Sequence, residues 1–353
     1  MPTTDFDLIV AGAGIVGMST ALWAQKEGLK TLICDPAPPG SGTTYGSACT
    51  IATYACIPVN SSTIFKSLPH LLTSKDSPLS FNLTHGLKNP RWMLSFLNNC
   101  RHSRVKHITQ ALGNFLRHAD GGLDPLITEA NAQDLIVSND CLYVWSSRSG
   151  FENAATSNAM RAEQGVVFDE LGPDEIRALE PNLQRPMHRG LRFKGARHIT
   201  DPQELVRRMQ VRFEALGGTY LPQKIDRTQA DDTGVTAFLG DGTQIRGKRL
   251  ALTAGARSGQ IKGSGAEHTP LGTERGYHII YRNHGASIAR PVGWAEAGFY
   301  ATPMAEGLRI AGTVEINAID APFNTNRTEY LRRKSHEMFG NIGTPDTTWI
   351  GHR

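Results

Sequence analysis

A glycine-rich turn between an apolar strand and a helix, within the first forty residues, most constrains the fold of this chain. The apolar residues 6–10 (FDLIV) predict a buried parallel strand that runs directly into residues 12–17 (GAGIVG). A helix follows, and a second apolar run at residues 31–34 ends at Asp35. This order of strand, glycines, helix, strand and acid predicts the β-α-β unit of a dinucleotide-binding α/β fold.

Each position of the turn has a physical reason. Gly12 permits the tight turn, Gly14 lets a pyrophosphate approach the backbone, and Gly17 lets helix and strand pack closely. The helix begins at Ile15 and Val16, where free N–H groups and the positive end of the helix dipole face the phosphates. These features predict a bound dinucleotide, but they do not separate FAD from NAD.

The acid and the loop after the second strand extend the predicted site. Asp35 follows Gly12 by roughly 20 residues, where a carboxylate binds the ribose hydroxyls, and an acid there argues against a 2′-phosphate. The loop that follows is rich in Gly, Pro and hydroxyls. Ser41, Thr43 and Thr44 could contact phosphate or ribitol, and an ordinary solvated loop is the equal alternative.

Composition narrows the class of protein. The chain has 353 residues, a net charge of +4 and 39% hydrophobic residues, which excludes a disordered chain and suggests two domains or one large α/β unit. Scattered basic residues argue against a nucleic-acid partner. Five cysteines without CxxC spacing favour reduced thiols and no metal site. Without an apolar run of about 18 residues or a signal-peptide pattern, we expect a cytoplasmic protein.

The remaining sequence predicts mixed helices and strands. We expect helices at 89–99, 105–118 and 149–161, and another from Asp201 as N-cap to about residue 216. Residues 235–239 and 243–245 predict a hairpin, and 249–256 predict a further strand that ends in a small-residue turn. In the strand-rich part after residue 270, four polar residues could line a pocket or simply pack: Arg275, Tyr277, His278 and Tyr300.

Seven segments together make the sequence similar to a known family. They read VAGAGIVGMSTALWAQKEGLKTLICD, GSGTTYGSACTI, ARHITDPQELVRRM, RLALTAGARS, PLGTERGYH, ATPMAEGLRIAGTVE and TWIGHR, in that order along nearly the whole chain. The chain resembles the flavin-dependent D-amino-acid oxidase superfamily, most closely its D-amino-acid dehydrogenase branch. The resemblance implies a Rossmann-like FAD-binding domain and a second α+β substrate domain built on a mainly antiparallel sheet.

The resemblance also implies where the domains and the cofactor lie. Residues 1–60, 195–262 and 345–353 would form the FAD-binding domain, and 61–194 with 263–344 the substrate domain. FAD would be the cofactor, held at its pyrophosphate by the glycines and at its ribose by Asp35. The other implied cofactor contacts are Thr43, Thr44, Ser47, Ala48, Ile225, Ala254 and Gly255. The segment 275–278 would pack near the substrate, and Arg353 would pair with its carboxylate.

Two departures from the family pattern stand out. The family's loop usually reads Asn-Ala-Gly where this chain has Ser47, Ala48 and Cys49, so a thiol replaces a glycine near the flavin. The chain also stops at Arg353, inside a motif that the family continues through a strand and helix that complete the FAD sheet. We therefore expect a C-terminally truncated member of the family.

The activity that the resemblance implies is oxidative deamination of D-amino acids to 2-oxo acids and ammonia, by hydride transfer to flavin. Quinone or oxygen would accept the electrons, and the dehydrogenase resemblance favours peripheral contact with the inner face of the membrane. Three alternatives remain open. They are oxidation of a secondary amino acid such as sarcosine, D-proline or a hydroxyproline, a non-catalytic remnant, and an NAD-dependent dehydrogenase.

Overall fold

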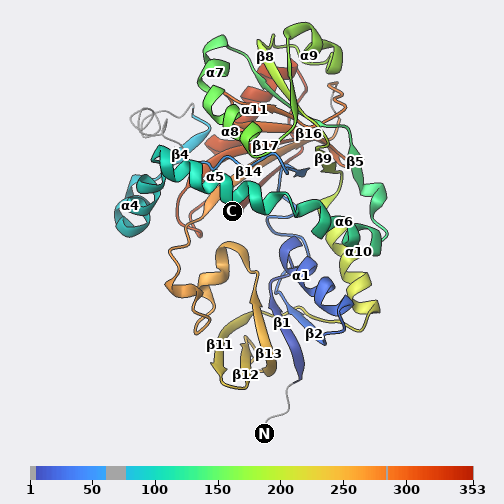
Figure 1. Ribbon diagram of the computed structural model, residues 1–353, viewed down its shortest axis with the longest axis vertical. Helices are drawn as coiled ribbons and strands as arrows, with labels where there is room; N and C mark the ends of the chain where they lie inside the picture. The colour runs from blue at the N-terminus through green and yellow to red at the C-terminus, as the bar shows by residue number, and fades with distance from the viewer. Residues whose placement is uncertain (1–4, 61–76, 284, 353) are drawn as a thin grey trace.

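The computed structural model describes residues 5–60, 77–283 and 285–352, and within these residues the strands form three sheets. Figure 1 shows the two larger sheets at opposite ends of the long axis, with helix α5 (His102–Leu116) crossing between them. A large part of each sheet comes from chain segments that are far apart in sequence. The predicted fold class, an α/β fold with a Rossmann-like unit and a second, mainly antiparallel unit, is confirmed.

The sheet at the lower end of Figure 1 is called the Rossmann sheet here. Its strands, in spatial order, are β10 (Thr219–Leu221), β2 (Thr31–Cys34), β1 (Phe6–Ala11), β13 (Gln244–Leu252), β12 (Gly234–Leu239) and β11 (Ile225–Asp231). β1 pairs in parallel with β2 on one side and with β13 on the other. All four residues of β2 are buried, because both faces of this part of the sheet are covered.

Helices α1 (Ile15–Lys26) and α10 (Pro202–Ala215) pack together on one face of the Rossmann sheet. The Asp201 side chain accepts a hydrogen bond from the Glu204 N–H at 2.9 Å, so the predicted N-cap of α10 is confirmed. Met18 and Phe213 are fully buried between the helices and the sheet. The packing holds the start of α1 at the carboxyl ends of the strands.

The larger sheet at the other end of the molecule is called the large sheet. Its path is β18 (Thr347–His352), β14 (Glu274–Tyr281), β17 (Gly307–Ile316), β16 (Phe299–Met304), β15 (Val292–Trp294), β6 (Cys141–Trp145), β8 (Arg189–Phe193) and β7 (Phe168–Leu171), with β4 (Leu79–Phe81) beside β17. Its pairs are antiparallel except β15 with β6 and β17 with β4. Helix α11 (Thr325–Phe339) buries Tyr330 and Leu331 in the core of this unit.

A small sheet and several helices complete the described fold. The small sheet has the order β3 (Thr50–Ile51), β9 (Arg197–Ile199) and β5 (Ile136–Ser138). The other helices are α3 (Leu83–Lys88), α4 (Pro90–Asn99), α6 (Ala119–Glu129), α7 (Arg148–Asn153), α8 (Ala155–Glu163) and α9 (Pro173–Leu179), with 3₁₀ turns at Gln133–Leu135, Gly255–Gln260 and Ala266–His268. In the described part of the chain, no helix has the length and apolar character needed to cross a membrane.

Three expectations differ from the structure. The predicted strands at 243–245 and 249–256 are one continuous strand, β13, because it pairs with β12 along its first half and with β1 along its second. The predicted helix at 149–161 is two helices that meet at Ala154. Residues 345–353 were grouped with the FAD-binding domain, but β18 hydrogen-bonds to β14 of the large sheet. The rest of the predicted domain division stays a prediction.

Candidate functional site

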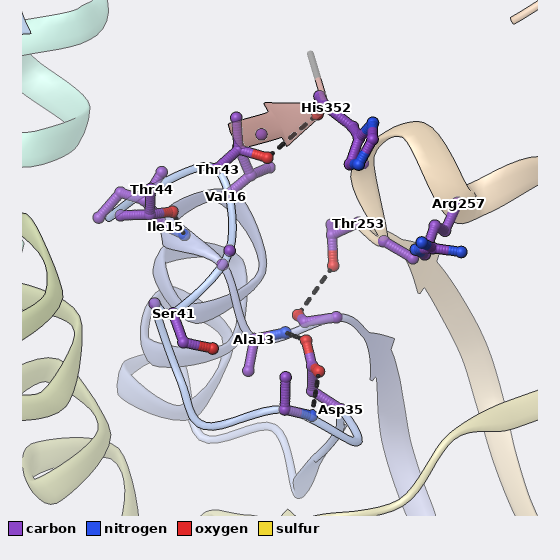
Figure 2. A pocket seen from close by; sticks show the side chains of 18 of the residues that line it. Ala13, Ile15, Val16, Asp35, Ser41, Thr43, Thr44, Thr253, Arg257 and His352 are labelled. Atoms are coloured by element: carbon purple, nitrogen blue, oxygen red, sulfur yellow. Dashed lines mark hydrogen bonds between the residues drawn. The ribbon is translucent and has the colours of Figure 1, made fainter. Parts of the chain in front are cut away.

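A cavity of about 990 Å³ opens where the carboxyl ends of β1, β2 and β13 meet the first turn of α1. In an α/β sheet of this kind, ligands bind outside the carboxyl ends of the strands. Figure 2 shows this cavity with Ala13 and Asp35 at the ends of β1 and β2, and Thr253 and Arg257 from the segment after β13. On the far side, Thr43 of the loop lies beside His352 of β18.

The backbone around the glycine turn packs so closely that Gly12 and Gly17 leave no room for a side chain. Gly12 has φ +112°, and a Cβ there would lie 2.6 Å from the Thr253 carbonyl oxygen. A Cβ at Gly17 would lie 1.9 Å from the Gly12 carbonyl oxygen, so α1 and the turn touch through backbone. Gly14 differs from both, because the nearest atom to a Cβ there is the Thr44 hydroxyl at 3.5 Å. Its open side leaves the backbone accessible to a ligand.

The start of α1 and the end of β2 supply polar groups to the cavity. The Ile15 N–H donates to the Thr44 hydroxyl at 3.0 Å, which holds the loop against the first turn of the helix. The two oxygens of Asp35 accept hydrogen bonds from the Ala13 N–H at 2.7 Å and the Ala37 N–H at 2.8 Å. The first turn of α1 carries no acidic residue, so its positive dipole end stays available to an anion.

Most of the cofactor residues expected from the sequence line this cavity. They are Gly12, Gly14, Ile15, Val16, Asp35, Thr43, Thr44, Ser47, Ile225, Ala254 and Gly255. Gly17 lies beneath the turn and acts through packing. Ala48 turns its carbonyl away to the Thr302 hydroxyl of β16, at 2.9 Å. Which of these residues touches the cofactor stays a prediction.

Sequence reasoning missed several lining residues. Trp349, Ile350, Gly351 and His352 reach the cavity from β18. A Cβ on Gly46 would lie 1.8 Å from the Trp349 ring, so the indole fits only because that position is glycine. The sequence signal for these residues is the apolar segment TWIGH, which contains a glycine and stands directly before Arg353. Arg353 itself lies outside the described residues.

The sequence leaves two alternatives for Arg275 and Tyr277, lining a polar pocket or packing, and in the structure both side chains are buried. The register of β14 and β17 places Arg275 directly opposite Glu315, and their side chains form a buried ion pair at 3.1 Å. Arg275 also donates to the carbonyls of Ala321 and Pro322. The Tyr277 hydroxyl donates to the same Glu315 carboxylate, and burial raises the pKa of that hydroxyl. These residues therefore form a buried structural network around Glu315 that does not line the cavity.

His278 and Tyr300 also lie outside the cavity lining. Tyr300 stacks on Tyr143 with ring centroids 5.7 Å apart, and burial raises the pKa of its hydroxyl. The His278 ring is fully buried, stacks on the Trp349 ring at 5.1 Å, and has its Nδ1 3.2 Å from the Gly46 carbonyl. Because a carbonyl only accepts, Nδ1 carries the proton. Burial, with help from the Arg309 charge, lowers the pKa of His278 to about 3.

The donors of this cavity fit a dinucleotide better than a metal. Within the described residues, no three His, Cys, Asp or Glu side chains gather to hold a metal ion. The cavity instead combines a helix N-terminus, a glycine turn open at Gly14 and a carboxylate at the end of β2. These are the groups that bind pyrophosphate and ribose.

The model of the family described as "FAD dependent oxidoreductase" matches residues 7–353. This chain belongs to that family. FAD is therefore its cofactor, which the glycine turn alone did not distinguish from NAD, and the predicted family and cofactor are confirmed. The chain is an oxidoreductase whose Gly12–Gly17 turn and Asp35 fit the dinucleotide part of FAD.

Relatives and solved structures agree with this assignment. The chain is 29% identical to a D-amino-acid oxidase of Bradyrhizobium diazoefficiens, covering 98% of this chain and 83% of that protein. It is 24% identical to a D-amino acid dehydrogenase of Dechloromonas aromatica, covering 98% and 86%. Its fold is similar to that of glycine oxidase from Geobacillus kaustophilus, with a TM-score of 0.70 at 14% identity over 99% of this chain and 83% of that one.

Two glycine substitutions separate folding from cofactor binding. We expect Gly12→Ala to destabilise the protein by about 1–3 kcal/mol, because a Cβ there meets backbone atoms and φ is positive. We expect Gly14→Ala to leave the melting temperature nearly unchanged and to weaken FAD binding roughly tenfold, about 1.4 kcal/mol. Thermal unfolding and flavin fluorescence titration measure both. Unchanged FAD affinity in Gly14→Ala would contradict a close approach of the cofactor to this turn.

A double-mutant cycle tests the structural role of Arg275. We expect Arg275→Met to destabilise the protein by about 3–5 kcal/mol, because it leaves the Glu315 carboxylate buried without its ion-pair partner. Adding Glu315→Met should recover part of the loss, since the unpaired charge is then removed. Chemical denaturation of the wild type, the two single variants Arg275→Met and Glu315→Met, and the double variant measures this coupling. If Arg275 instead binds substrate, Arg275→Met will retain stability and raise KM.

Proposed function

We propose that this FAD-dependent oxidoreductase deaminates D-amino acids to 2-oxo acids and ammonia. The supporting observation is the relative named a D-amino-acid oxidase, which matches 98% of the chain at 29% identity. A relative named a D-amino acid dehydrogenase points to the same substrate class. Both relatives match over the segments that build the cavity, from the glycine turn to β18.

In the proposed reaction, the chain's own residues bind and orient the substrate. Arg353 pairs with the substrate carboxylate through a charge-assisted, bidentate contact. Bound FAD supplies the two-electron acceptor for the hydride that leaves the substrate Cα. As that hydride leaves, the neutral amine becomes a positively charged iminium group, and water then hydrolyses this iminium to the 2-oxo acid and ammonia, which is released in its protonated form. No side chain needs to remove a proton from Cα.

His278 has no acid–base part in this proposal. Its pKa of about 3 keeps the ring neutral at every pH where the enzyme would work. The buried proton on Nδ1 is engaged with the Gly46 carbonyl. Its role in the proposal is to support the Trp349 ring, on which it stacks and which lines the cavity.

Oxidation of a secondary amino acid is the second candidate. Two solved structures that share the fold are an iminodiacetate oxidase from Chelativorans sp. BNC1, with a TM-score of 0.65, and an L-proline dehydrogenase from P. horikoshii, also 0.65. Their identities to this chain are 18% and 14%, so the likeness supports the scaffold and leaves the substrate to experiment. The remnant hypothesis predicts a chain that does not retain FAD.

An anaerobic absorbance spectrum with a substrate panel tests the proposal. We expect the purified chain to carry flavin bands that bleach on adding D-amino acids and persist with their L-enantiomers, because D-amino acids are the proposed substrate class. Sarcosine, D-proline and hydroxyproline test the second candidate in the same cuvette. Bands that bleach only with these would replace the first candidate, and absence of flavin would favour the remnant.

The matched variant for this experiment is Arg353→Lys, with Arg257→Lys as the control. The lysine keeps a positive charge but loses the bidentate contact, so we expect the Arg353 variant to raise KM at least tenfold, about 1.4 kcal/mol, with FAD still bound. Arg257 lines the cavity near Asp320, its ion-pair partner at 3.5 Å. Equal effects of both substitutions on KM would remove the proposed role of Arg353.

A further part of the proposal concerns the electron acceptor and the membrane. The protein would be cytoplasmic and would bind peripherally to the inner face of the membrane. Residues 77–118 contain no Asp or Glu, and every Lys and Arg among them is exposed. These cations lie on or beside α3, α4 and α5, namely Lys88, Arg91, Arg101, Arg104, Lys106 and Arg117. Such a basic surface is attracted to anionic lipid headgroups at about 1 kcal/mol per residue near the surface.

We expect co-sedimentation with phosphatidylglycerol vesicles at low salt, and little with phosphatidylcholine vesicles. Exchanging Arg101, Arg104 and Lys106 for Gln should reduce binding, whereas exchanging Arg227, Lys248 and Arg249 of the Rossmann sheet should not. Turnover with a soluble quinone and without hydrogen peroxide would accompany membrane binding. Stoichiometric peroxide and no vesicle binding would instead favour oxygen as acceptor.

A further inference from the structure

The segment Tyr45–Cys49 forms part of the cavity wall and is held from outside along its whole length. Ser47 and Cys49 line the cavity. All five backbone carbonyls of the segment accept hydrogen bonds, from donors on four different strands. The donors are Arg309 of β17 to Tyr45 and Ser47, His278 of β14 to Gly46, Thr302 of β16 to Ala48, and the Ile199 N–H of β9 to Cys49.

Arg309 is the centre of this arrangement. Its side chain is 1% exposed and its guanidinium contacts three parts of the segment, the Tyr45 and Ser47 carbonyls and the Cys49 Sγ at 3.1 Å. It also lies over the Tyr45 ring, 5.0 Å from the centroid. The second guanidinium nitrogen of Arg309, Nη2, donates a hydrogen bond to Glu306 Oε1 at 2.6 Å. The contacts to the segment come from Nη1, while Nη2 pairs with Glu306, so the planar fork holds the segment and the carboxylate at the same time. A lysine ammonium is a single point of charge and does not occupy both positions.

The segment needs this support because its backbone is unfavourable. Cys49 has φ +61°, a left-handed conformation that favours glycine and is unfavourable for a residue with a side chain. At the other end, the Trp349 ring occupies the space where a Cβ of Gly46 would be. Contacts from outside must therefore hold the segment in place.

We propose that Arg309 is a positioning residue: its buried guanidinium fixes the backbone of Tyr45–Cys49 and thereby the cavity wall against which bound FAD lies. The inference rests on FAD occupying this cavity, and only its kinetic readout rests on the proposed deamination. Arg309 itself does not line the cavity, so it acts through the segment.

The test compares Arg309→Met, Arg309→Lys and the control Arg207→Met in the full chain. Arg207 has a 58% exposed side chain, and its guanidinium pairs with Glu204 on α10 through both Nε and Nη2. For each variant, thermal unfolding reports stability, flavin titration reports the FAD dissociation constant, and the visible flavin spectrum reports the surroundings of the ring. Alkylation by N-ethylmaleimide, mapped by mass spectrometry, compares Cys49 with Cys34, which lines the same cavity at the end of β2.

We expect Arg309→Met to raise the Cys49 to Cys34 alkylation ratio at least tenfold, and to change the shape of the flavin band. Its FAD dissociation constant should rise less than tenfold, because the glycine turn and Asp35 remain. The value of kcat should fall by a larger factor than KM rises, since the misplaced group is the cofactor. Arg309→Lys should recover part of each effect, because it keeps a charged donor but loses the second arm of the guanidinium, and Arg207→Met should match the wild type.

A wild-type alkylation ratio and flavin spectrum in folded Arg309→Met would overturn the proposal. If that variant does not fold, Arg309→Lys decides instead, and a wild-type ratio and spectrum there would equally overturn it. A protein that binds FAD with the expected changes but oxidises no amino acid would refute the proposed deamination and leave the role of Arg309 standing.

Discussion

The parallel pairing of β1 with β2 on one side and β13 on the other is the constraint on which the site depends. It brings the carboxyl ends of three strands, from the beginning and the middle of the chain, to the first turn of α1. There Gly12 and Thr253 approach so closely that no side chain fits between them. Backbone donors, a helix dipole and the Asp35 carboxylate thus converge on one cavity, as dinucleotide binding requires.

The large sheet supplies the opposite wall. Trp349 reaches the cavity from β18, and the Tyr45–Cys49 segment is held by hydrogen bonds from β14, β16 and β17. The cavity is therefore shared between two units whose cores are separate. A shift of one unit against the other would change the shape of this cavity. The buried Arg309 and His278 resist such a shift, because each would leave a polar atom without its partner.

Local patterns predicted well what depends on local geometry. The glycine turn, the run of β2, the N-cap at Asp201 and the carboxylate at Asp35 are each specified within a few residues. Side-chain partners across strands were not predictable in this way. Arg275 is typical of a substrate residue in sequence, yet the register of β14 and β17 places it opposite Glu315 in the core. Arg309 lies in a segment used for the family resemblance, but nothing adjacent to it indicates a role.

The sequence by itself determined the dinucleotide unit, the mixed α/β fold and the FAD-dependent family, because these follow from glycine spacing and from motifs read in order along the chain. Tertiary structure alone decided which residues face the cavity. The Trp349 ring packs against Gly46 and stacks on His278. These three residues come from separate segments that lie far apart in the sequence. Contacts of that range are set by strand pairing, which no local window of sequence contains.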